Sequence, residues 1–261
     1  MIEPRQPTNL KAIFENEDAV VYKPREDLWL LQTQEGVPVS IYILEGSEKT
    51  LVIDAGHLIK HFKDLINKIT QKPLILAITH GHHDHIGSIN EFDTIYMDQG
   101  DKSYVSNYQG KIENIKNGYT FDLGNREIEV IEMYGHTQGS IGFLDKKGKF
   151  LIAGDAIGNE TCWMHVSQLP LESLIGTLKH LISIKDKWTE IYPGHYNETN
   201  RAFDLQYVED LLDLAQKICY TKDYTAQPYE AKGFKFDFQP MIAYGNNGVG
   251  LIYNPKKLHY V

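Results

Sequence analysis

A short segment dense in histidine constrains this chain more than any other feature. From His80 to His85 the sequence His-Gly-His-His-Asp-His places four imidazoles and one carboxylate within six residues. Burying that many imidazoles without partners would be costly, whereas a divalent metal of borderline softness binds neutral imidazole and carboxylate well. One turn cannot direct four side chains at a single ion. We therefore expect His80 and His82 to serve one ion, and Asp84 and His85 a second.

Each ion then needs ligands from elsewhere in the chain, and three residues are candidates. His136, Asp155 and His195 each follow an apolar run and stand beside a glycine. Loops at the ends of neighbouring strands can converge on one rim of a sheet, where a shared site would form. Taken singly, such a residue is more often a cap or a solvated loop residue. Together with the histidine cluster, the three predict a metal site.

The apolar pattern predicts a layered α/β fold. The run directly before the histidine cluster, Leu74–Ile78, suits a strand buried on both faces. Apolar residues at helical spacing predict helices over residues 58–69, 171–182 and 208–218, with Pro170 suited to the first turn of the second. Strands that alternate with helices indicate stacked layers. The other predicted strands are 28–32, 39–44, 50–53, 127–133, 140–144, 149–153 and 191–192.

The C-terminal residues 220–261 have a different character. Phe234, Phe236 and Phe238 alternate, and residues 241–253 read as a hairpin around Gly245 to Gly248. We interpret this part as an aromatic β element appended to a single domain that spans residues 1–261. Its aromatic side chains could form a substrate wall or a dimer interface, and plain packing against the domain is the simpler interpretation.

The order of these residues resembles the metallo-β-lactamase superfamily. The resemblance rests on His80-X-His82-X-Asp84-His85, followed by His136, Asp155 and His195, and it covers roughly residues 25 to 200. Asp54, in Leu-Val-Ile-Asp-Ala-Gly, matches the aspartate at the end of an early strand in that family. The resemblance implies a four-layer αβ/βα sandwich of the metallo-β-lactamase type, with the metals at one edge.

The resemblance also implies a role for each position. Asp54 would orient a ligand imidazole or a backbone turn rather than touch a metal. His83 occupies a variable position of the motif, and His57 is interpreted as an ordinary surface histidine. Two zinc ions are the expected cofactor, with iron or manganese as alternatives. One metal would be held by His80, His82 and His136, the other by Asp84, His85 and His195, with Asp155 bridging both.

Such a site predicts a zinc-dependent hydrolase. Metal ions lower the pKa of a bound water to about 7, and a pair ~3.5–4 Å apart can stabilise the oxygen that gains charge. We expect a metal-bridging hydroxide, oriented by Asp84, to cleave a small ester, lactone, thioester or phosphodiester. The substrate would be a small molecule that is anionic or bears a carbonyl or phosphoryl group. The alternatives are a mononuclear iron dioxygenase of the same fold, using His80, His136 and Asp155, and a catalytically silent metal-binding sensor.

Departures from subfamily patterns narrow the substrate class. True β-lactamases of the family usually lack a carboxylate at the position of Asp155, which disfavours the hydrolysis of antibiotics. Di-iron relatives usually carry Glu where His82 stands, which favours zinc over iron. The stretch after Asp155 lacks the arginine- and glycine-rich sequence of glyoxalase II, so glutathione thioesters are not supported. The same stretch is expected to overhang the site. Candidates to line the pocket are Trp163, His165 and Tyr196.

Composition sets the remaining expectations. The net charge is −9, and the sequence has no basic run, which argues against a nucleic-acid or membrane-surface binder. The first residues lack the apolar core of a signal peptide. Two distant cysteines, Cys162 and Cys219, suggest reduced thiols in a cytoplasmic protein. A homodimer is possible.

Overall fold

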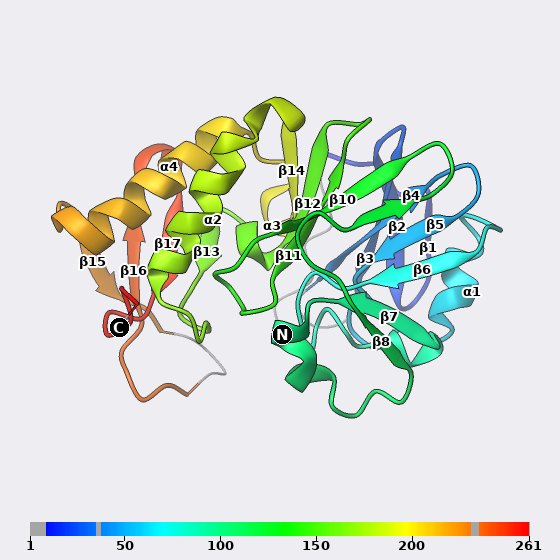
Figure 1. Cartoon of the computed structure of the whole chain (residues 1–261), viewed down its shortest axis with the longest axis horizontal. Coiled ribbons are helices and arrows are strands. Elements are labelled where there is room, and N and C mark those ends of the chain that lie inside the picture. The colour runs from blue at the N-terminus through cyan, green and yellow to red at the C-terminus, as the bar shows by residue number, and fades with distance from the viewer. Residues whose placement is uncertain (1–8, 35–37, 231–234, 261) are drawn as a thin grey trace.

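The computed structural model describes residues 9–34, 38–230 and 235–260. Its strands form three sheets, and two of these lie at the centre of the molecule (Figure 1). The first sheet has the order β1-β2-β3-β4-β5-β6-β7-β8, antiparallel up to β5 and parallel from β5 to β8. Its strands are β1 (Phe14–Glu15), β2 (Ala19–Arg25), β3 (Leu28–Thr33), β4 (Ser40–Glu45), β5 (Thr50–Ile53), β6 (Leu74–Ala77), β7 (Thr94–Met97) and β8 (Lys111–Asn114).

The second sheet faces the first and has the order β14-β12-β11-β10-β9. β12 and β14 run parallel, and the other neighbouring pairs are antiparallel. The strands are β9 (Thr120–Asp122), β10 (Glu127–Glu132), β11 (Ile141–Asp145), β12 (Phe150–Gly154) and β14 (Glu190–Pro193). All eight of the strands that the sequence pattern predicts correspond to strands of these two sheets.

The alternation of side chains along the strands explains how the layers stack. In β4, Tyr42 and Leu44 join the core between the two sheets, whereas Ile41 and Ile43 join the core beneath α1 (Phe62–Ile66). The outer face of the second sheet is covered by α2 (Leu171–Ser183) and α4 (Leu205–Gln216). The order helix, sheet, sheet, helix is the four-layer αβ/βα sandwich that the resemblance implies.

The predicted helix over residues 58–69 is much shorter in the structure. The chain enters α1 through His61, whose φ of 55° is left-handed, and Leu58 is 71 % exposed. The first turn of α1 is held by a residue far along the chain, since the Glu91 carboxylate accepts hydrogen bonds from the backbone N–H groups of Phe62 and Lys63. The apolar spacing therefore marks a buried face, but only part of it is helical.

The C-terminal element pairs with β13 in a third, four-stranded sheet, which has the order β13-β17-β16-β15. Its strands are β13 (Thr161–Trp163), β15 (Ala226–Pro228), β16 (Met241–Tyr244) and β17 (Gly250–Tyr253), so the predicted hairpin over 241–253 is confirmed. Phe236 and Phe238 lie outside any strand, contrary to their alternating pattern, and Phe234 lies outside the described residues. This sheet joins the chain end to the segment that follows Asp155.

Short helical turns complete the description. They are α3 (Tyr196–Thr199), the 3-10 helices η1 (Ile89–Glu91), η2 (Gln99–Val105), η3 (Asp155–Ile157), η4 (Lys185–Lys187) and η6 (Asn246–Gly248), and the π-helix η5 (Lys217–Thr221). Within the described ranges, no helix is both long enough and apolar enough to cross a bilayer. Cys162 and Cys219 are both buried free thiols.

Candidate metal centre

The histidine cluster begins directly after β6, and Asp54 fixes its entrance. Asp54 follows β5 with a left-handed φ of 68°, and its carboxylate accepts hydrogen bonds from the Thr79 backbone N–H at 2.7 Å and the Thr79 hydroxyl at 2.8 Å. His85 Nδ1 lies 2.8 Å from the same carboxylate. The parallel pairing of β5 with β6 brings these residues together, because both strands end at the same edge of the sheet.

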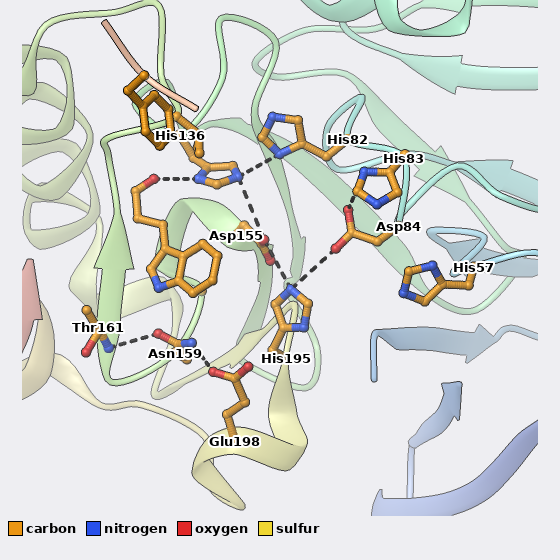
Figure 2. A pocket seen from close by; sticks show the side chains of 14 residues that line it. His57, His82, His83, Asp84, His136, Asp155, Asn159, Thr161, His195 and Glu198 are labelled. Atoms are coloured by element: carbon orange, nitrogen blue, oxygen red, sulfur yellow. Dashed lines mark hydrogen bonds and ion pairs between the residues drawn. The ribbon is translucent and has the colours of Figure 1, made fainter. Parts of the chain in front are cut away.

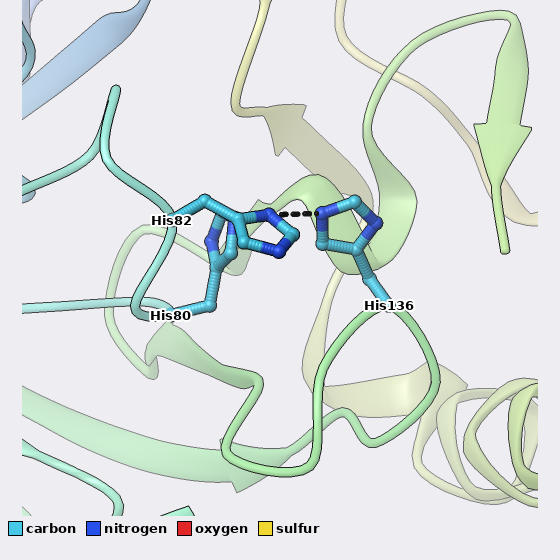
Figure 3. Close-up of side chains that lie close together, drawn as sticks. All are labelled: His80, His82 and His136. Atoms are coloured by element: carbon cyan, nitrogen blue, oxygen red, sulfur yellow. Dashed lines mark hydrogen bonds between the residues drawn. The ribbon is translucent and has the colours of Figure 1, made fainter. Parts of the chain in front are cut away.

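His80, His82 and His136 form the first group of converging side chains (Figure 3). His82 Nδ1 lies 3.1 Å from His80 Nε2 and 2.9 Å from His136 Nε2. His136 reaches the group from the loop after β10, and its Nδ1 lies 2.8 Å from the Trp163 carbonyl oxygen. A proton on that Nδ1 would donate to the carbonyl and leave the Nε2 lone pair directed into the group.

Asp84, His85 and His195 form a second group. His195 follows β14, and its Nδ1 lies 2.9 Å from the Pro38 carbonyl oxygen, while its Nε2 lies 3.8 Å from Asp84 Oδ2. His85 Nε2 also lies 3.8 Å from Asp84 Oδ2. Both histidines are thus anchored through Nδ1 and present Nε2 to the same space.

Asp155 lies between the two groups. It follows β12, and its Oδ2 lies 3.3 Å from His195 Nε2 and 3.7 Å from His136 Nε2. Its Oδ1 lies 3.5 Å from His85 Nε2. The carboxylate therefore faces members of both groups, which is the position that a bridging ligand requires.

Two of the buried atoms in this cluster lack hydrogen-bond partners among the described residues. They are His85 Nε2 and Asp155 Oδ1, which face each other. Buried polar atoms without partners are costly, and a cation between them would satisfy both. The set of imidazole nitrogens and carboxylate oxygens suits zinc, so the residues present fit the expected metals.

Protonation divides the two groups in the metal-free protein. Burial, reinforced by the neighbouring His82, lowers the pKa of His136 to about 4, and burial lowers the pKa of His80 well below its usual range. Burial also opposes the charge on His195, but Asp155 outweighs it and raises that pKa to about 9. The pKa of His85 is raised well above its usual range for the same reason, by Asp155, Asp54 and Asp84. The first group is thus neutral, and the second holds protons that a metal ion must displace.

Two glycines allow the close approach of these ligands. Gly154 turns the chain at a φ of 53° immediately before Asp155. A Cβ on Gly194, next to His195, would lie 2.1 Å from Asp155 Oδ1 and 3.1 Å from His85 Cε1. A side chain at position 194 would therefore enter the space between two ligand candidates.

Asp101 was not singled out from the sequence, yet it connects the loops that carry His80 and His136. It is buried on η2, and its carboxylate accepts hydrogen bonds from the backbone N–H groups of Gly81 and Gly139 and from the Thr137 hydroxyl. Asp101 belongs to no recognisable motif, although β7 (Thr94–Met97) ends shortly before it, and the sequence does not distinguish it from the nearby Asp98.

The cluster opens into a cavity of about 540 Å³ (Figure 2). Trp163, expected at the pocket, lines it. His165 is instead buried in an aromatic cluster, and Tyr196 is buried in the core between the sheets, stacked on Tyr192. The lining residues are His57, His82, His83, Asp84, His136, Asp155, Gly158, Asn159, Thr161, Trp163, Val166, His195, Glu198 and Phe236.

Several lining residues were not expected from the sequence. His57 and His83, interpreted as a surface residue and a variable position, lie at the cavity with their rings 6.0 Å apart. Glu198 stands one turn beyond His195, a spacing that could have suggested it. Phe236 comes from the C-terminal element, and the sequence alone does not bring that residue to the site.

Known proteins resemble this chain in sequence. Residues 35–99 and 92–195 match the family model described as "Metallo-beta-lactamase superfamily". The human protein named acyl-coenzyme A thioesterase MBLAC2 is 24% identical over 211 residues, which cover 63% of this chain and 75% of that protein. The hydroxyacylglutathione hydrolase of Photobacterium profundum is 30% identical over 173 residues, 65% of this chain and 67% of that protein.

Solved structures support the fold. A metallo-beta-lactamase from Pontibacter korlensis superimposes with a TM-score of 0.63 at 18% identity, covering 75% of this chain and 98% of that one. The DIM-1 metallo-beta-lactamase gives a TM-score of 0.63 at 16% identity, covering 78% and 99%. At this identity the likeness concerns the fold alone.

Proposed function

The chain belongs to the metallo-beta-lactamase superfamily, and from this premise we propose that it is a di-zinc hydrolase that cleaves an acyl thioester or ester. One zinc ion would be held by His80, His82 and His136. The other would be held by Asp84, His85 and His195, with Asp155 between the two. The two relatives described above are hydrolases by name, and both names denote enzymes that act on acyl groups.

The observation that carries this proposal is the pair of unpartnered buried atoms at the centre of the cluster. His85 Nε2 and Asp155 Oδ1 lie 3.5 Å apart without a hydrogen bond to any described residue. The surrounding imidazoles of His85, His136 and His195 are each anchored through Nδ1, so their Nε2 atoms converge on the same space. A bound cation accounts for this arrangement, whereas packing does not.

The chemistry of the bound ions is the activation of water and the polarisation of a carbonyl oxygen. Asp84 reaches the cavity, and its side chain is 18% exposed. Burial opposes its charge, but His85 and His195 hold the pKa of Asp84 below its usual range, so it is a carboxylate at neutral pH. It can therefore accept a hydrogen bond from the attacking water and hold that water in line with the carbonyl carbon.

The other residues of the site fix the ligands. Asp54 holds His85, the Trp163 carbonyl holds His136, and the Pro38 carbonyl holds His195. Because each anchor sits on a strand end or the adjoining loop, the ligand nitrogens keep their directions before any ion binds. Preorganisation of this kind lowers the cost of forming the site.

The proposal is tested by metal analysis and turnover. We expect two zinc ions per chain and hydrolysis of acyl thioesters, with esters, lactones, acyl-glutathione, acyl-coenzyme A and phosphodiesters in the same panel. Asp84→Ala and His136→Ala should each lose metal and activity while keeping the fold, and His180→Ala on α2 serves as the control. Full metal content and full turnover in either site variant would rule out the ligand assignment.

The same measurement separates the alternatives. One iron ion per chain, oxygen consumption and no hydrolysis would identify the mononuclear dioxygenase. Two bound ions with no turnover of any substrate would favour the metal-binding sensor.

We also propose that the chain is a single domain, that it acts in the cytoplasm and that it can form a homodimer. Limited proteolysis, cell fractionation and sedimentation test these three points.

A further inference from the structure

The cavity has an apolar wall on the side of the C-terminal element. Trp163, Val166 and Phe236 line it together. Trp163 is directly connected to the metal centre, because its carbonyl oxygen lies 2.8 Å from Nδ1 of His136. A group resting on this wall would therefore lie beside the reacting carbonyl carbon.

A buried histidine holds the wall in place. His165 is 2% exposed, and its ring lies 5.6 Å from the Trp163 ring, 5.5 Å from Tyr229 and 5.3 Å from Phe236, measured between centroids. Phe238 continues the cluster, 5.1 Å from Phe236. The imidazole thus packs as an aromatic ring between β13 and the C-terminal element. Residues 226–253 lie beyond the part of the chain that matches the family model, so Phe236 reaches the wall from outside the matched residues, whereas Trp163 and Val166 lie within them.

A negatively charged side chain lines the cavity close to β13, the strand that carries Trp163. Glu198 lines the cavity from α3, and its carboxylate accepts a hydrogen bond from the Asn159 side-chain amide (Figure 2). Asn159 is held in turn, because its Oδ1 accepts from the Thr161 backbone N–H at 2.9 Å and its carbonyl oxygen accepts from the Tyr207 hydroxyl at 2.7 Å. Among the described residues that line the cavity, none is Lys or Arg.

We propose that the wall of Trp163, Val166 and Phe236 binds the acyl chain of the substrate, so that the C-terminal element sets the preference for long, uncharged acyl groups. Glu198 then disfavours acyl groups that end in an anion. This inference rests on the proposed hydrolysis of acyl thioesters. It adds the chemical class of the acyl group and the residues that select it.

The experiment uses zinc-loaded protein and thioesters of one neutral thiol, N-acetylcysteamine. The acyl groups are acetyl, octanoyl and octanedioyl, the last with a free carboxylate at its far end. We expect kcat/KM to rise about fourfold for each methylene that the wall covers. Octanoyl should be preferred over octanedioyl, and because the two chains have the same length, this preference reports the terminal carboxylate. Part of that preference, about fivefold, is the repulsion from Glu198 across water.

Matched variants assign the effects. Phe236→Ala should lower kcat/KM for octanoyl about tenfold and leave acetyl unchanged, whereas Phe236→Leu should keep most of the preference. Tyr244→Ala is the control, since Tyr244 is an exposed aromatic residue of the C-terminal element that does not line the cavity. Glu198→Gln should remove its share of the discrimination against octanedioyl, and Glu160→Gln, an exposed carboxylate that is not at the cavity, should not.

Binding without turnover separates this inference from the proposed function. Quenching of tryptophan fluorescence by octanamide and by the monoamide of octanedioic acid reports affinity even if no thioester is cleaved. Tighter binding of octanamide that is lost in Phe236→Ala supports the wall as an acyl site. An octanoyl preference and an octanamide affinity that are both unchanged in Phe236→Ala would overturn the inference, whatever the outcome for hydrolysis.

Discussion

Replacing Asp54 by Asn should weaken zinc binding although Asp54 touches no proposed metal position. Its Oδ1 accepts from the Thr79 backbone N–H, and its Oδ2 faces both the Thr79 hydroxyl and His85 Nδ1. An Asn amide, whichever way it is turned, directs its NH₂ group at an N–H donor. If that donor is His85 Nδ1–H, the proton must move to Nε2, the atom that faces the site.

The magnitude follows from these contacts. Asp54 is 1% exposed, so a lost hydrogen bond to its charge costs ~1.5–3 kcal/mol of unfolding free energy in the metal-free protein. Partners that orient a ligand imidazole are worth about 10- to 100-fold in metal affinity. We expect the zinc dissociation constant of Asp54→Asn to rise by that factor.

The assay pairs urea denaturation of the metal-free protein with zinc titration against a competing chelator. Asp145→Asn is the control. Asp145 is equally buried and accepts hydrogen bonds from the backbone of Lys147 and Gly148 and from Arg126, in a turn away from the site. It should lose comparable stability and keep its zinc affinity. Unchanged zinc affinity in Asp54→Asn, or an equal loss in both variants, would refute the tautomer argument.

Three further predictions concern packing around the site. The Cβ of Gly194→Ala would overlap Asp155, so this variant should lower zinc affinity at least about a hundredfold, measured by chelator competition. Its control, Gly176→Ala, lies in open space on α2 and should raise the free energy of unfolding by ~1 kcal/mol. Unchanged zinc affinity in Gly194→Ala would contradict the close contacts on which the ligand set depends. Burial raises the pKa of Cys162 to about 12 and that of Cys219 to about 11, so at pH 8 roughly one thiol in a thousand or fewer is a thiolate. A disulfide reagent should therefore label these cysteines only as the protein unfolds. Rapid labelling of the folded protein would contradict this prediction. Tyr42→Phe leaves the buried Pro193 carbonyl without its 2.7 Å hydrogen bond and should cost ~1–2 kcal/mol in urea denaturation, and a neutral result would mean that another donor reaches that oxygen.

The sequence predicts the layers and the convergence of the site better than it predicts local helix ends. Burial on two faces sets the apolar pattern of a strand, and this signal is local and repeated, so the strand over residues 39–44 is predicted; in the structure Tyr42 and Ile43 lie on its opposite faces. The helix over residues 58–69 fails because its start depends on Glu91, which no local pattern connects to Phe62.

The candidate ligands could be predicted because they lie in the loops that follow apolar strands and because four of them belong to one histidine-rich segment. The remainder of the site could not. Phe236 and Asn159 reach the cavity only through the pairing of β13 with β17 and through contacts such as that of Tyr207 with Asn159. Those contacts join residues that are far apart along the chain, and neither residue belongs to a motif. The cytoplasmic location, the single domain and the dimer stay predictions.

The ligand candidates are divided between the two central sheets. The cluster from His80 to His85 follows β6 of the first sheet, whereas His136, Asp155 and His195 follow strands of the second, and His82 and His136 meet across the gap at 2.9 Å. An ion held by both sides would have to be released before the sheets separate. If the gap between the two sheets closes only after both have formed, bound zinc should slow unfolding strongly and leave the folding rate nearly unchanged. The metal would then provide kinetic stability, and the lifetime of the folded chain would depend on the supply of zinc.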